Sequence, residues 1–244
     1  MTKLFEQPYS YWVGLDTPSD ASAEDLIAFN EFYDDIHVPE VLAANEGMVS
    51  AARFELVRPD ARGDFGPRWL AVYELADEQA AREYVRRNGP GASDRPTYSA
   101  GPLLWSQMTA RWRILWERIA EVGSLPEDDS ELLFLVGMSV PDDTAPEQLE
   151  QFNDFYTSVH LVEVMKHGGF PRACRLALHE DLLHPSPGAP TFCAAYETGG
   201  PDPLDGLFGA PPGTFTDGPP AWTARDTRWR LLYRRLTTTV GVAR

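Results

Sequence analysis

A tyrosine, a histidine and a glutamate recur at one spacing in two places in this sequence. The histidine follows the tyrosine by four residues and the glutamate follows by three more, in Tyr33, His37 and Glu40 and again in Tyr156, His160 and Glu163. Side chains three or four residues apart meet on one face of a helix. An imidazole exchanges protons near neutral pH, and a carboxylate can orient its second nitrogen. The spacing predicts proton transfer on an enolisable carbonyl compound, with His37, Tyr33, Glu40, His160 and Tyr156 as catalytic residues.

Further polar and aromatic residues recur in both places and are predicted to bind the substrate. On a helical wheel, Asn30 shares one polar edge with Tyr33 and His37. Arginines on a later strand could hold a carboxylate or an enolate oxygen. The predicted substrate-binding residues are Asn30, Arg53, Tyr73, Trp105, Asn153, Glu163, Arg175, Tyr196 and Trp222. In the alternative, structural interpretation, the polar edge satisfies its own hydrogen bonds and the arginines pair with the acidic surface.

These residues belong to an internal repeat. Residues 26–37 match residues 149–160, 123 positions later. A second block, residues 101–113, matches residues 218–230 at an offset of 117, with Gly-Pro, Trp and Arg-Trp-Arg in the same order. The stretch between the copies is rich in Gly, Pro and acidic residues, which is typical of an exposed connection. We therefore predict two halves, residues 1–122 and 130–244, joined by a linker at residues 123–129.

The residue pattern predicts the same elements in each half. In the first half, strands are expected at 9–15, 49–57, 69–75 and 109–119. Helices are expected at 23–42 and 77–88, with Ser22 and Asp77 as N-caps and a stop at Gly89-Pro90. This order, β-α-β-β-α-β, is the ferredoxin-like unit. The second half follows it, with its second helix reduced to 203–208. Each sheet has one bare face, so an α+β fold that packs the halves sheet to sheet is expected.

The segment Phe32 to Pro39 resembles the first-helix signature of EthD-like and muconolactone-isomerase-like proteins of the dimeric α/β-barrel superfamily. Tyr33, His37 and Pro39 match that signature, whereas Phe32 replaces its first histidine and Val162 replaces the proline in the second copy. The resemblance implies a pseudo-dimeric α/β barrel that binds an aromatic or polyketide-like molecule between sheet and helices. The superfamily includes cofactor-free monooxygenases, polyketide cyclases, lactone isomerases and haem enzymes.

Composition excludes several classes of function. The net charge of −16 argues against nucleic acid and against an anionic membrane surface as partners. The apolar runs are too short to span a bilayer and no signal peptide is visible, so a cytoplasmic location is expected. Cys174 and Cys193 are expected to be buried as small hydrophobic residues. His179 and His184 lack a convincing metal-ligand spacing, and no nucleotide-binding motif is present, so no metal and no cofactor are predicted.

Together these patterns predict a cofactor-independent enzyme. It would act by acid–base chemistry on a small polyketide-like or aromatic carbonyl compound, giving cyclisation, isomerisation or dehydration. The alternatives are a cofactor-free monooxygenase and a non-catalytic protein that binds a small molecule. The first half is favoured as the active one, because it keeps the fuller signature. The chain is expected to be a monomeric pseudo-dimer or a homodimer, with the small-molecule substrate as its partner.

Overall fold

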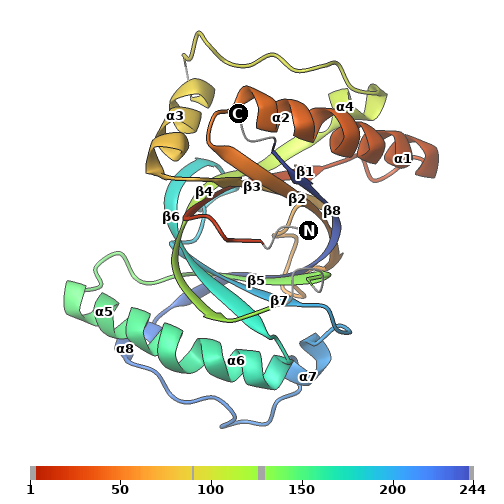
Figure 1. The fold of residues 1–244 in the computed structure, drawn as a ribbon. Coiled ribbons are helices and arrows are strands. Elements are labelled where there is room, and N and C mark those ends of the chain that lie inside the picture. The colour runs from red at the N-terminus through yellow and green to blue at the C-terminus, as the bar shows by residue number, and fades with distance from the viewer. Residues whose placement is uncertain (1–3, 90, 126–129, 242–244) are drawn as a thin grey trace.

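The computed structural model describes residues 4–89, 91–125 and 130–241. Its centre is a closed antiparallel barrel in the order β1-β3-β2-β8-β5-β7-β6-β4 (Figure 1). The first half contributes β1 (Tyr9–Asp16), β2 (Met48–Arg58), β3 (Trp69–Leu75) and β4 (Thr109–Gly123). The second half contributes β5 (Leu132–Ser139), β6 (Arg172–Leu183), β7 (Phe192–Thr198) and β8 (Asp226–Val240). This mixed α+β architecture is consistent with a pseudo-dimeric ferredoxin-like fold.

Two long strands, β4 and β8, close the barrel. Strand β4 pairs with β1 of its own half and with β6 of the other half. Strand β8 pairs in the same way with β5 and with β2. The halves therefore share hydrogen bonds along two seams, which leaves the barrel without a free edge.

The helices cover the outside of the barrel, with those of each half over its own strands (Figure 1). The first half has α1 (Ala23–Phe32), a π-helical turn η1 (Tyr33–His37), α2 (Val38–Ala44), α3 (Glu78–Asn88) and α4 (Leu103–Gln107). The second half has α5 (Pro146–Phe155), η2 (Tyr156–His160), α6 (Leu161–Gly168), α7 (Leu204–Phe208) and α8 (Pro220–Thr223). None of the described helices is both long and apolar enough to cross a membrane.

Three hydrophobic cores hold these layers together. The barrel interior is filled by side chains of both halves, including Trp12, Trp112, Trp116 and Trp229, together with Leu4 and Phe5 from the N-terminal segment. Each outer core lies between one half's strands and its helices. Cys174 and Cys193 are free and fully buried, as the sequence predicts. The predicted aromatic site residues belong to the outer cores or pack against them, so a ligand beside them would lie outside the barrel, under the helices.

Most predicted elements are present with small shifts at their ends. The helix expected at 23–42 extends from Ala23 to Ala44 through η1, and the Ser22 and Asp77 side chains accept hydrogen bonds from the Asp25 and Ala80 amides. The short helices α4 and α8 are not predicted. Helix α3 ends before Gly89 as expected, whereas Pro90 and linker residues 126–129 lie outside the described part of the chain. The proposed domain limits remain a prediction.

Candidate functional site

Both tyrosine–histidine pairs lie on π-helical turns. The Val38 amide donates to the Tyr33 carbonyl, and the Leu161 amide donates to the Tyr156 carbonyl, so each bond spans five residues instead of four. Such turns are rare inside α-helices and often mark functional sites. A proline at position 39 does not explain them, because the second copy has Val162 there and the same turn.

The turn brings each tyrosine and histidine together under a tryptophan. The ring centroids of Tyr33 and His37 are 5.3 Å apart, and those of Tyr156 and His160 are 5.6 Å apart. The tryptophan of the following short helix covers each imidazole, Trp105 at 4.5 Å from His37 and Trp222 at 4.3 Å from His160. Both histidines are therefore enclosed by aromatic rings.

Enclosure changes the acid–base character of both histidines. Burial lowers the pKa of His37 to about 4 and the pKa of His160 to about 4, because the charged imidazolium loses its hydration. Neither Nδ1 atom has a hydrogen-bond partner among the described residues. Each imidazole is thus neutral at physiological pH and has a ring nitrogen that is not committed to the protein.

The two glutamates do not orient the histidines, so that part of the predicted mechanism is wrong. The Glu40 carboxylate accepts hydrogen bonds from the amide and the hydroxyl of Ser99. The Glu163 carboxylate accepts from the amide of Thr216, at 3.1 and 3.2 Å, and from its hydroxyl, at 2.6 Å. Each glutamate fastens the loop that leads to the tryptophan-bearing helix. Each glutamate therefore helps to hold a tryptophan over the imidazole, Trp105 in the first half and Trp222 in the second.

The two arginines differ in their partners. Arg53 forms an ion pair with Asp34 at 2.8 Å, as the structural alternative predicts. Arg175 has Thr157 in the matching position, at 3.0 Å, and has no carboxylate partner among the described residues. Each guanidinium lies over the ring of its tyrosine, at 4.0 Å from Tyr33 and at 4.4 Å from Tyr156.

The predicted asparagines accept hydrogen bonds from these arginines. The Asn30 side-chain oxygen accepts from Arg53 at 2.7 Å, and the Asn153 oxygen accepts from Arg175 at 2.8 Å. Tyr73 and Tyr196 are fully buried beside Tyr33 and Tyr156, and burial raises the pKa of all four phenols. The Tyr156 hydroxyl is buried without a hydrogen-bond partner among the described residues.

A cavity of about 350 Å³ lies beside the second pair. Its apolar wall includes Phe134 of β5 and Leu207 and Phe208 of α7. Its polar wall includes Tyr156 and His160, with Arg225 just before β8 and Arg230 on that strand. The volume is near the lower end of the range for small-molecule sites. The sequence favoured the first half, whereas this cavity belongs to the second.

The matching space in the first half holds larger side chains. Tyr84 of α3 occupies the position that matches Leu207, and its ring is 4.5 Å from that of Tyr11. Tyr98 matches Phe215, and its ring is 5.1 Å from His37. In the second half, α7 is only five residues long where α3 has eleven. The shorter helix and the smaller side chains explain why the cavity is there.

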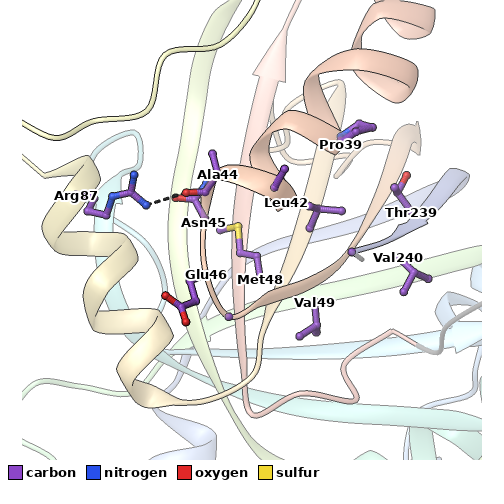
Figure 2. Close-up of a pocket in the computed structure, with 13 residues that line it drawn as sticks. Pro39, Leu42, Ala44, Asn45, Glu46, Met48, Val49, Arg87, Thr239 and Val240 are labelled. Carbon is purple, nitrogen blue, oxygen red and sulfur yellow. Dashed lines mark hydrogen bonds between the residues drawn. The ribbon is translucent and has the colours of Figure 1, made fainter. Parts of the chain in front are cut away.

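A larger hollow of about 1080 Å³ lies elsewhere, between the end of α2, the start of β2 and the end of β8 (Figure 2). It is lined mostly by apolar residues such as Leu42, Met48 and Val240. Arg87 at its edge donates to the Ala44 carbonyl at 2.8 Å (Figure 2). None of the predicted site residues lines this hollow, whereas Tyr156, His160, Tyr196 and Trp222 line the smaller cavity.

Arg225 is not predicted from the sequence, and Arg230 is recognised there only as part of a repeated motif. Arg230 is the last residue of the second Arg-Trp-Arg motif and matches Arg113, so the repeat itself was the available signal. Arg225 has Met108 in the matching position of the first half. The two halves therefore differ in charge at this position.

No protein-family model and no curated protein matches the sequence. Solved structures match nearly the whole chain. An anthrone oxidase-like protein aligns with a TM-score of 0.60 over 98% of this chain and 95% of its own, at 11% identity. A mutant chlorite dismutase from Candidatus Nitrospira defluvii gives 0.53 over 96% and 93%, at 10% identity. A DypB variant from Rhodococcus jostii RHA1 in complex with haem gives 0.51 over 99% and 97%, at 11% identity.

At this identity the matches establish the fold alone. The chain has the dimeric α+β barrel fold. The expectation of cofactor-independent acid–base catalysis is contradicted, because the structural neighbours include chlorite dismutases and a protein with bound haem. The site agrees with that correction. His37 and His160 titrate well below neutral pH, and the carboxylates of Glu40 and Glu163 are engaged elsewhere.

Proposed function

We propose that the second half binds haem and uses it to oxidise a small molecule. The observation that carries this proposal is His160, a neutral, partly buried imidazole that lines an aromatic cavity and whose buried Nδ1 has no hydrogen-bond partner among the described residues. A haem iron accepts such an imidazole as an axial ligand. When bound, haem supplies one-electron and oxygen chemistry.

The residues around the cavity fit haem in their chemistry. His160 would hold the iron, Phe134, Phe208 and Trp222 would contact the macrocycle, and Arg225 and Arg230 would face the propionates. The cavity is smaller than a tetrapyrrole, so haem would have to move α7 outward. This helix has five residues between segments rich in proline and glycine, and its movement would break the ion pair of Asp205 with Arg58 and expose the buried Leu204 and Leu207.

We also propose a family relationship for the chain and bounds for its two halves. The first-helix residues Tyr33, His37 and Pro39 support a relationship to EthD-like proteins. The strand order within each half and the internal repeat support ferredoxin-like halves at residues 1–122 and 130–244.

Titration with hemin tests the proposed function. The protein is expected to shift the hemin Soret band with a one-to-one end point, and His160→Ala should abolish this shift. His37→Ala is the matched control, because His37 has the same π-helical turn and the same aromatic enclosure in the other half. Absence of a Soret shift in the wild-type protein, or equal loss in both variants, would refute haem binding at His160.

A further inference from the structure

Positive charge gathers at the cavity of the second half without matching negative charge. Arg225 and Arg230 line the cavity, and Arg175 lies behind the Tyr156 ring. None of these three guanidinium groups forms an ion pair with a carboxylate in the described part of the chain. The protein as a whole carries a net charge of −16, so such a cluster stands out against its surroundings.

The nearby carboxylates are engaged with other groups. Asp60 pairs with Arg62 at 2.6 Å and accepts from the Arg230 backbone amide, not from its guanidinium. Asp226 pairs with Arg228 at 2.9 Å. Glu163 is held by Thr216. These contacts leave the cavity side of Arg225 and Arg230 free for an anion from outside the chain.

Arg225 is also held in a fixed position. Its guanidinium carbon lies 3.5 Å from the centroid of the Trp222 ring, and its Nη1 donates to the Trp222 carbonyl. Its Nε is buried without a partner among the described residues. Burial lowers the pKa of Arg225 and of Arg230, which reflects the cost of keeping two cations close together and away from water. An anionic ligand would remove that cost.

The first half supplies the comparison. There the arginine behind the tyrosine is neutralised by Asp34, and Met108 occupies the place of Arg225. The second half has Thr157 in place of that aspartate and gains one arginine. The two differences act in the same direction, and both raise the positive potential at the cavity.

We infer that this cavity recognises the carboxylate of a flat aromatic ligand through Arg225 and Arg230. The aromatic body packs on Trp222, Phe215 and Phe208, and the carboxylate accepts charge-assisted hydrogen bonds from the two arginines. The carboxylate belongs either to a free aromatic acid or to a haem propionate. The inference rests on the cavity of the proposed function, but it does not require haem.

Two probe pairs separate these sources. For a free acid, calorimetric titration of the haem-free protein compares 1-naphthoate with 1-naphthalenemethanol, which has no charge. For haem, a Soret titration compares hemin with its dimethyl ester. The charged probe should bind at least about tenfold more tightly than its neutral partner in at least one pair, and 0.5 M NaCl should reduce this preference. Equal affinity within both pairs, or no binding by any charged probe, overturns the inference.

Variants assign the effect to this cavity. Arg225→Met installs the first-half residue and should remove the preference for the charged probe, whereas Arg225→Lys should keep part of it. Arg113→Met alters the matching position of Arg230 in the first half and should leave binding unchanged. Thermal unfolding of each variant checks that it is folded.

If naphthoate binds selectively and hemin does not bind, the haem proposal fails and this inference stands. If Arg225→Met folds and keeps full selectivity, the inference fails.

Discussion

At the residue scale, the two π-helical turns determine what each histidine can do. The sequence pairs the right tyrosine and histidine, because a spacing of four brings them together in an α-helix and in a π-turn alike. It assigns the glutamates the wrong role, because local spacing within a helix does not show the distant loop residues that hydrogen-bond to them. Glu40 and Glu163 then meet Ser99 and Thr216, which are more than fifty residues away in the chain.

The buried imidazoles should titrate near pH 4. A folded-state pKa below the unfolded value means that the unfolded chain takes up the proton first as the pH falls. His37 and His160 should therefore each contribute up to about 3 kcal/mol of stability above pH 6.5 that is lost between pH 6.5 and 4. NMR titration of the imidazole protons measures both pKa values. Titration of either residue above pH 6 would contradict the burial argument, and His160→Phe should remove part of the acid sensitivity.

Glu74 should produce the opposite pH dependence. Burial raises its pKa to about 7, although the Gln7 amide and the Ser50 hydroxyl donate to it. Because the folded-state pKa is raised, this group costs stability as the pH rises from 4.5 through 7, by up to about 3 kcal/mol. Glu74→Gln should make the protein more stable at pH 8 and change it little at pH 5, as measured by urea unfolding. A loss of stability at pH 8 would show that the charged form is well solvated.

At the element scale, the difference between α3 and α7 decides which half is hollow. The sequence predicts both helices and the reduced length of the second, because a proline- and glycine-rich segment cannot continue a long helix. It does not predict the cavity, because the empty space depends on Tyr84, Tyr98 and their counterparts meeting a strand far away in sequence. The short helices α4 and α8 were missed for a similar reason, since each is too short to show a hydrophobic period.

Exchanging one side chain between the halves should move the cavity. Leu207→Tyr places the first-half residue in α7 and fills empty space. It should reduce the binding of hemin or naphthoate at least about tenfold. It should also stabilise the fold by about 0.5–2 kcal/mol. The reciprocal variant, Tyr84→Leu, should cost about 2–4 kcal/mol. It should not gain naphthoate binding, because Asp34 already neutralises Arg53. Calorimetric titration and urea unfolding measure both. Unchanged ligand affinity in Leu207→Tyr would place the binding site elsewhere.

At the scale of the whole molecule, duplication has produced one barrel with two unlike faces. The barrel interior is shared and filled by tryptophans of both halves, so neither half can change there without the other. The outer cores are separate, and each contains its own tyrosine, which a histidine and an arginine contact. This arrangement lets one half keep tyrosines that fill its site while the other develops an open, positively charged cavity.

The same arrangement predicts that neither half folds alone. A fragment of residues 1–125 would expose the paired edges of β2 and β4, and a fragment of residues 130–244 would expose those of β6 and β8. Each would also lose the side chains that the other half contributes to the barrel interior. Expressed separately, the fragments should be unfolded or self-associated, whereas co-expression should restore a one-to-one complex, because the two seams rebuild the closed barrel. Circular dichroism and native mass spectrometry distinguish these results.

A monomeric fragment that unfolds cooperatively on its own would contradict this prediction. It would show that the outer core of one half is sufficient for folding, and that the barrel joins two independent domains.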